Sequence, residues 1–242
     1  MGQHAKHRSL VKLTALAIGL WAAPAQACRL ALVLAMDVSS SVDAAEDQLQ
    51  RAGLAAALID PDVQAAFFVS ADPVALHVFE WSGRYNQATV QDWLLIEGPE
   101  DLLNAATQIG LSDRSQTESP TAVGYALGHA ATQLAKAPPC AAQTIDLAGD
   151  GINNERFGPA EAYAAFPFAG VIVNGLVVKS GPATEQAAII AYYRDEVIRG
   201  PASFVEVADG FEEYAAAMRR KLLRELTSQM MGAIPQPRGF AG

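Results

Sequence analysis

Four mostly apolar runs constrain the fold of this chain more than any other feature of its sequence. They cover residues 30–36, 74–81, 144–148 and 171–178. Runs of this kind, without a clear polar face, are typical of strands that are buried on both sides in a parallel sheet. With 51% hydrophobic residues, the chain can also form a sizeable core around them.

The segments between these runs have apolar residues at spacings of three and four, which indicates amphipathic helices. Alternating strands and helices predict one α/β domain with a mainly parallel sheet and helices on both faces. Two further short strands are expected at residues 93–96 and 204–207. We expect helices over residues 43–59, 99–109, 122–135, 155–166, 184–197 and 211–226.

The first 27 residues have the features of a secretory signal peptide. Basic residues precede an apolar run over 13–23, and Ala25-Gln26-Ala27 has the small-x-small form of a cleavage site. The apolar run is about half of the roughly 20 residues that a membrane-spanning helix needs. We therefore expect an exported protein, periplasmic or secreted, without a transmembrane segment in its mature part.

Cleavage would leave a domain over residues 28–230 and a flexible tail over 231–242, which is rich in proline and glycine. It would also remove three positive charges, those of Lys6, Arg8 and Lys12, and change the formal net charge from −9 to −12. An acidic surface of this kind repels nucleic acid, so we expect no nucleic-acid partner.

The chain has two cysteines, Cys28 and Cys140, and each lies just before an apolar run. If the two runs are neighbouring parallel strands, both cysteines lie at the same end of the sheet, within bridging distance. An oxidising compartment permits this disulfide. Acylation of Cys28, the first residue after the expected cleavage site, is the alternative.

Polar residues follow two of the predicted strands directly. Asp37, Ser39 and Ser41 place oxygen atoms at every second position after the first strand, and Asp150 follows the run 144–148. Ligands of parallel sheets bind beyond the carboxyl ends of the strands. Thr121, at the start of a predicted helix, adds a third hydroxyl. Such hard oxygen donors suit Mg²⁺, with Mn²⁺ or Ca²⁺ as alternatives.

Asp37-x-Ser39-x-Ser41, Thr121 and Asp150-Gly151 resemble, in this order, the metal-ion-dependent adhesion site of von Willebrand factor type A (VWA) domains. The stretches ALVLAMDVSSSVD and IDLAGDGINN more specifically resemble a bacterial VWA-like family of unknown function. The similarity covers about residues 28–230. It implies a Rossmann-like VWA fold in which the short strand 93–96 is an antiparallel edge strand.

The resemblance also implies roles for the five residues. Ser39, Ser41 and Thr121 would contact the metal directly or nearly so, and Asp37 and Asp150 would act directly or through water. An acidic side chain of a protein partner would complete the coordination, so the implied function is protein binding. This sequence departs from many VWA domains at Ser119-Pro120, where they have glycines.

Two other functions remain open. The metal site could serve only to hold loops together in a structural or assembly module, or it could belong to a metal-assisted hydrolase. The sequence contains none of the common nucleophile-elbow, phosphate-loop, dinucleotide-binding or His-Glu-x-x-His motifs. A phosphatase of the haloacid dehalogenase type would need an aspartate where Ser39 stands. We therefore expect no enzymatic activity.

Other polar residues have simpler structural explanations. His77 and His129 lie within predicted elements without a partner motif, so we expect structural roles for them. Asp146, inside a strand, is expected to be paired or to lie at an edge. Four basic residues, Arg219, Arg220, Lys221 and Arg224, are expected to form a solvated face late in the last helix.

Overall fold

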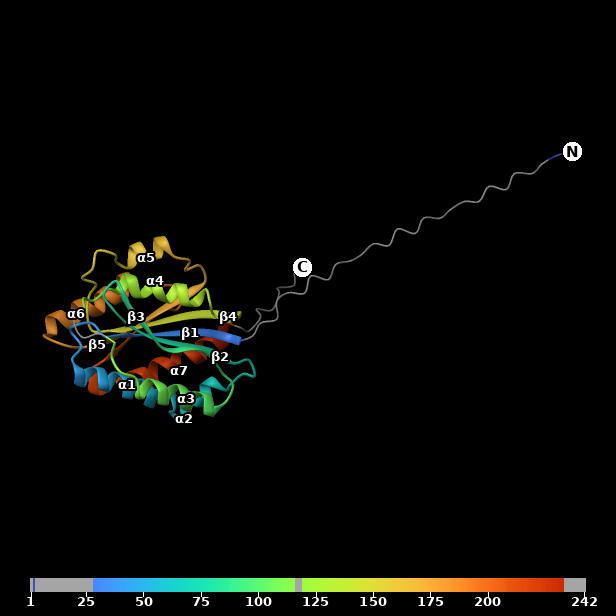
Figure 1. The fold of residues 1–242 in the computed structure, drawn as a ribbon, viewed down its shortest axis with the longest axis horizontal. Coiled ribbons are helices and arrows are strands. Elements are labelled where there is room, and N and C mark those ends of the chain that lie inside the picture. Colours follow the sequence, from blue (N-terminus) through green and yellow to red (C-terminus); the bar gives the residue numbers. More distant parts are fainter. Residues whose placement is uncertain (1, 3–27, 116–118, 233–242) are drawn as a thin grey trace, which may run out of the picture.

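The computed structural model describes residues 2, 28–115 and 119–232, and it has three layers (Figure 1). A six-stranded sheet with the order β3-β2-β1-β4-β5-β6 lies between two layers of helices. All neighbouring strands are parallel except β2 and β3, so the predicted mainly parallel sheet with an antiparallel edge is confirmed. The strands are β1 Cys28–Asp37, β2 Val74–Ser82, β3 Asn86–Ile96, β4 Cys140–Gly149, β5 Val171–Val178 and β6 Val205–Ala208.

Helices cover both faces of the sheet, with α4, α5 and α6 on one side and α1, α2, α3 and α7 on the other (Figure 1). A π-helical turn, Tyr193–Val197, follows α6, and a 3-10 turn, Phe211–Glu213, precedes α7. The helices are α1 Ala44–Leu58, α2 Pro61–Phe67, α3 Pro99–Gly110, α4 Val123–Leu134, α5 Pro159–Ala165, α6 Ala183–Tyr192 and α7 Tyr214–Gly232.

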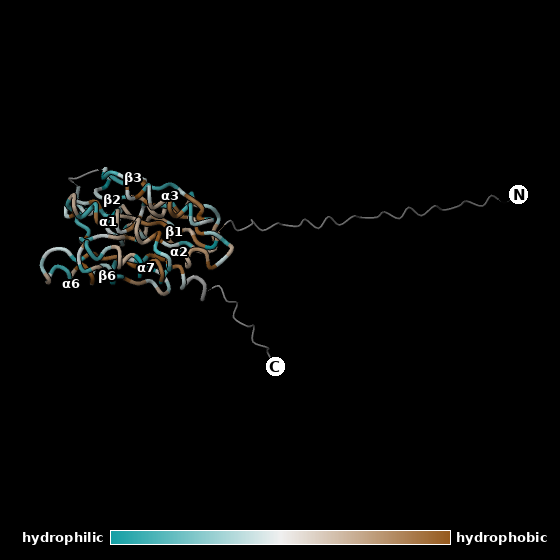
Figure 2. The backbone as a smooth tube through the Cα atoms, turned by 90° about the horizontal axis from the view of Figure 1, so that it is seen from below, coloured by the Kyte–Doolittle hydropathy of each residue, from teal (hydrophilic) through white to brown (hydrophobic). Residues whose placement is uncertain are grey.

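The alternation of side chains in β1 explains how one strand serves two cores. Its leucines and Met36 pack on the α1 and α7 side, whereas the smaller Ala31, Val33 and Ala35 pack on the α4 side. Figure 2 shows the hydrophobic stretches around β1 in the middle of the protein. Asp37 continues the second set by two residues, so its side chain lies on the α4 side.

Several predicted bounds differ from the structure because local caps override the apolar pattern. Asp60 caps a separate helix, α2, whose first residue is Pro61, so the Asp-Pro pair begins a helix as well as ending one. Likewise Pro159 begins α5, four residues later than expected. The antiparallel hairpin with β2 extends β3 back to Asn86.

The predicted disulfide between Cys28 and Cys140 is confirmed. The two residues are partners in the register of β1 and β4, with their Cα atoms 4.5 Å apart. The bridge ties together the amino-terminal ends of the two central strands, and it leaves Cys28 no thiol to be acylated.

The expected signal peptide, apart from residue 2, and residues 233–242 of the expected tail lie outside the described residues. So do residues 116–118 in the loop before Thr121. α7 continues to Gly232, two residues into the segment expected to be a tail. Among the residues that are described, no helix has the length and apolar character that a membrane span requires.

A buried ionic network corrects one prediction about α7. Lys221 is not solvated with its basic neighbours but is fully buried, and its ammonium group contacts Asp146 and, at 2.7 Å, Glu225. Lys221 follows Tyr214 by seven residues and therefore lies on the same, buried face of the helix. Asp146 is thus paired, as expected, and Asn174 donates a further hydrogen bond to Glu225 at 2.6 Å.

Candidate metal site at the carboxyl end of the sheet

The structure brings all five predicted ligand residues together. β1 ends at Asp37, and its neighbour β4 ends one residue before Asp150, so their loops meet at the same edge of the sheet. Thr121 Oγ1 donates to Ser39 Oγ at 3.3 Å, and the hydroxyl oxygens of Ser39 and Ser41 lie 3.1 Å apart. Ser41 Oγ donates to Asp150 Oδ1 at 2.6 Å, and the Ser39 backbone N–H donates to Asp37 Oδ1 at 2.8 Å.

The site is buried at its base and open at one side. Asp37 and Ser39 are fully buried, and Thr121 and Asp150 are 5% and 2% exposed. Ser41, in contrast, is exposed to solvent. An ion held by these oxygens would therefore be reachable from the side of Ser41.

Asp37 is a fully buried carboxyl group, and no cationic side chain among the described residues lowers its pKa. Burial, and then the nearby charge of Asp150, raise the pKa of Asp37 to about 7. Its Oδ1 accepts the hydrogen bond from Ser39, but its buried Oδ2 has no hydrogen-bond partner among the residues that the structure describes. Hydrogen bonding from the backbone of Ser39 and of Asp150 lowers the pKa of Asp37 in part. A bound cation would supply the missing positive charge.

The donor set fits a hard divalent cation. It consists of two carboxylates and three hydroxyls, the oxygen ligands that Mg²⁺ and Ca²⁺ take. Within the described ranges, no three His, Cys, Asp or Glu side chains gather as a metal cluster. The sulfur and nitrogen ligands of a structural zinc site are therefore not assembled there.

Thr121 is held in place although its loop has serine and proline where many VWA domains have glycines. The carbonyl oxygens of Ser119 and Pro120 accept hydrogen bonds from Ser40 and Gly83 at 2.9 and 2.7 Å, and the Thr121 carbonyl accepts one from Asn154 at 2.9 Å. A Cβ atom at Gly151 would lie 3.1 Å from Thr121 Oγ1. The glycine after Asp150 thus leaves room for the threonine hydroxyl.

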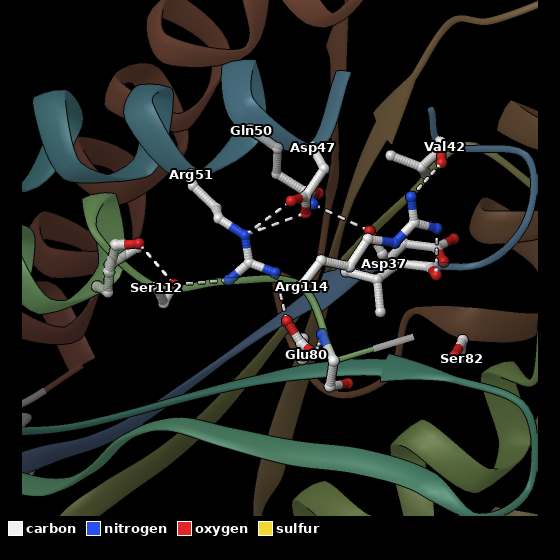
Figure 3. A network of polar contacts seen from close by, with 12 residues as sticks. Asp37, Val42, Asp47, Gln50, Arg51, Glu80, Ser82, Ser112 and Arg114 are labelled. Atoms are coloured by element: carbon white, nitrogen blue, oxygen red, sulfur yellow. Dashed lines mark hydrogen bonds and ion pairs between the residues drawn. The ribbon is translucent and has the colours of Figure 1, made fainter. Parts of the chain in front are cut away.

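Arg114 holds the loop that contains the two serines, and the sequence analysis missed it. Its guanidinium group donates to the carbonyl oxygens of Val38, Ser39 and Val42 at 2.7, 2.8 and 2.6 Å (Figure 3). Gln50 donates to the carbonyl oxygen of Asp37 at 2.9 Å. These bonds fix the backbone of the loop from behind and leave its side-chain oxygens free for the site.

A second arginine, Arg51, anchors the same region to the sheet and to the following loop (Figure 3). It pairs with Asp47 at 2.9 Å and with the buried Glu80, and it donates to Ser112 at 2.6 Å. Glu80 also accepts a hydrogen bond from the backbone of Ser115 at 2.7 Å. The loop that carries Arg114 is therefore attached at both of these points.

Ser180 is a further polar residue of the site that the sequence analysis missed. It follows β5, and its hydroxyl group donates a hydrogen bond to Asp150 Oδ2 at 2.9 Å. Since Ser41 donates to Oδ1, both oxygens of the Asp150 carboxylate accept a hydrogen bond from a serine hydroxyl. The signal was available, because Ser180 follows the end of a strand as Asp37 and Asp150 do.

The two histidines contact aromatic rings rather than the site. His77 is fully buried with its ring 5.2 Å from that of Trp93, and His129 lies 4.7 Å from Phe79. Burial lowers the pKa of each histidine to about 4, so both are neutral at physiological pH.

Solved structures of VWA proteins share this fold. Proximal thread matrix protein 1 of the mussel byssus, with its metal-ion-dependent adhesion site occupied by zinc, is 15% identical with a TM-score of 0.56. A von Willebrand factor type A protein from Catenulispora acidiphila is 16% identical (TM-score 0.54), and the pilus adhesin SpaC from Lactobacillus rhamnosus GG is 13% identical (TM-score 0.60).

The similarity to these three structures covers 83–85% of this chain but only 46%, 43% and 31% of theirs. The chain thus spans less than half of their length, and at these identities the likeness shows the fold alone. It confirms the predicted VWA fold.

No curated protein matches the sequence. A family of proteins does match it, over residues 27–230, which include all five residues of the candidate site and both cysteines. The chain belongs to the family described as "Protein of unknown function (DUF1194)" and has the fold of a VWA domain.

Proposed function

We propose that this protein is an exported binding module that uses a divalent cation, Mg²⁺ in the first place, to capture an acidic group of a protein partner. Asp37, Ser39, Ser41, Thr121 and Asp150 hold the cation directly or through water. The observation that carries the proposal is the convergence of these five oxygen-bearing side chains, from three separate loops, around the buried Asp37.

The coordination chemistry favours a partner carboxylate. Mg²⁺ takes six oxygen ligands, so five residues leave at least one position open on the solvent side. Where an aspartate acts through water, the directly bound ligands are mostly neutral hydroxyls, which leaves the ion attractive to a further anion. A carboxylate of the partner is the ligand that such an ion prefers.

The loops around the site offer apolar contacts to a protein surface. Tyr85, in the turn between β2 and β3, is 92% exposed, and Ile152, two residues after Asp150, is 42% exposed. Gly83 in the same turn is hydrogen-bonded to Pro120, beside Thr121. Exposed aromatic and aliphatic groups next to a metal ion suit protein binding. The adhesin and matrix proteins with this fold support the same function.

A peptide-display selection tests this proposal. The protein is immobilised with Mg²⁺, and bound peptides are eluted with EDTA. We expect the eluted peptides to share an Asp or Glu, and the matching Asn or Gln peptides not to bind. Asp150→Ala should bind none of them, while Ser40→Ala, which changes the exposed serine between Ser39 and Ser41, should bind all. Peptides that bind equally in EDTA would contradict the proposal.

The second function, a structural module whose metal only holds loops together, is favoured by the extent of the hydrogen bonding. Arg114, Gln50 and Ser180 already fix the loops of the site. This function predicts that Mg²⁺ raises the melting temperature but that no peptide is released by EDTA. The selection therefore separates the two functions.

A further inference from the structure

Two glycines in neighbouring strands make room for a single tyrosine. A Cβ atom at Gly175 in β5 would lie 2.7 Å from Cδ1 of Tyr193, and one at Gly149 in β4 would lie 2.5 Å from its hydroxyl oxygen. Neither glycine has a positive φ angle, so the backbone itself does not require glycine there. Glycine inside a strand weakens it and often marks a close approach. Here both strands accommodate Tyr193.

The helix that carries Tyr193 is irregular at this point. α6 ends at Tyr192, and the turn Tyr193–Val197 is π-helical, with Ile198 N–H bonded to the carbonyl oxygen of Tyr193. π-helical turns are rare in proteins, and those that occur are often found at functional sites. The ring of Tyr193 is fully buried, and within the described part of the chain its hydroxyl group has no hydrogen-bond partner.

The unpartnered hydroxyl lies beside the unpartnered oxygen of Asp37. The same point, the Cβ position of Gly149, is 2.5 Å from Tyr193 Oη and 2.8 Å from Asp37 Oδ2. Both atoms are buried. The tyrosine hydroxyl can donate a hydrogen bond, and the carboxylate oxygen, when ionised, can only accept one. Both atoms lie within 2.8 Å of one point, so a single water molecule can bridge them, and buried polar groups of folded proteins usually have such a partner.

A third unpartnered group borders the same space. Cζ2 of Trp81 lies 3.3 Å from that Cβ position, and the indole N–H of the same ring is buried with no hydrogen-bond partner among the described residues. Trp81 is the strand partner of Asp37 in β2. The three buried polar groups, two donors and one acceptor, are of the kind that a single buried water molecule pairs with.

We propose that Tyr193 is a positioning residue of the metal site. Its phenol group donates a hydrogen bond to one buried water molecule, which in turn donates to Asp37 Oδ2 and so fixes the orientation of the carboxylate on the ligand side. The consequence for metal affinity rests on the function proposed above, whereas the hydrogen bond itself does not. The residue thereby connects the π-helical turn after α6 with the first ligand of the site.

A double-mutant cycle in the metal-free protein tests the contact. Tyr193→Phe, Asp37→Ala and the double variant are unfolded in urea, with circular dichroism to verify the fold. We expect the shifts of the midpoint to be non-additive, because either change alone removes the same interaction. Tyr214→Phe is the matched control: Tyr214 is equally buried with an unpartnered hydroxyl, but it packs in the core on the other face of the sheet. Its shift should add to that of Asp37→Ala.

Calorimetric titration with Mg²⁺ tests the positioning role. Loss of a residue that orients a metal ligand weakens metal binding by about 10–100-fold. We expect a loss of this size for Tyr193→Phe and unchanged affinity for Tyr214→Phe. Equal affinities in Tyr193→Phe and wild type, or an additive cycle, would overturn the inference. Absence of Mg²⁺ binding in wild type, with a non-additive cycle, would instead refute the proposed metal site and support the hydrogen bond.

Discussion

Replacement of Lys221 by methionine should destabilise the protein strongly. The ammonium group lies between Asp146 and Glu225, and all three side chains are at most 2% exposed. Methionine preserves most of the volume but leaves two buried carboxyl groups without their cation. Breaking a buried ion pair from one side costs about 3–5 kcal/mol of unfolding free energy. For a domain of this size, that lowers the melting temperature by roughly 6 °C or more.

The effect should depend on pH in a defined direction. Burial, and then the charge of Glu225, already raise the pKa of Asp146 well above its usual range. Loss of the Lys221 charge raises this pKa further, so the folded variant favours the protonated acid. Stability held by a raised pKa is present in acid and lost as pH rises through the folded value. The defect of Lys221→Met should therefore shrink as pH falls.

Thermal unfolding followed by circular dichroism, repeated over a series of pH values, measures both effects. Lys179→Met is the control, since Lys179 pairs with the exposed Asp209 at 2.6 Å. An exposed pair contributes about 0–1 kcal/mol. If Lys221→Met were no more harmful than Lys179→Met, or if its defect grew in acid, the ionic network would not work as described.

Three further predictions concern stability. Replacing Cys28 and Cys140 by serine opens a loop with a sequence separation of 112 residues, so the urea midpoint should fall by an amount equivalent to about 4–5 kcal/mol; an unchanged midpoint would contradict this. Because burial lowers the pKa of His77 to about 4, stability should be lost as pH falls from about 6.5 through 4, and His77→Leu should show a shallower loss in acid titration than wild type. Gly124→Ala, whose Cβ would overlap backbone carbonyl oxygens, should lower the melting temperature, equivalent to about 1–3 kcal/mol, whereas Gly110→Ala, with its nearest neighbour at 3.5 Å, should raise it; the reverse order would refute the packing argument.

Four of the five proposed ligands have a clear local signal in the sequence. Asp37 and Asp150 directly follow apolar strands, and Ser39 and Ser41 follow Asp37 at a fixed spacing. The two cysteines supported the same strand pairing, which the register of β1 and β4 confirms. Patterns that extend over a few residues, or that mark the end of a strand, can be recognised in the sequence alone.

The residues that support the site could not be located in this way. Arg114 acts on carbonyl oxygens more than 70 residues away, and Tyr193 meets Asp37 only across two strands that carry glycines. Such contacts depend on strand order and on the twist of a helix, which no local pattern encodes. Lys221 is different, because its spacing of seven residues from Tyr214 already indicates the apolar face of α7. The prediction was wrong because Lys221 was grouped with its basic neighbours.

Direct titration of the purified protein with Mg²⁺ tests the central claim, that five oxygen-bearing side chains from three loops hold a divalent cation. We predict one Mg²⁺ per chain, reversed by EDTA, with binding abolished in Asp37→Ala and Asp150→Ala and retained in Ser40→Ala. Absence of binding in the wild type, or equal binding in all four proteins, would contradict the claim.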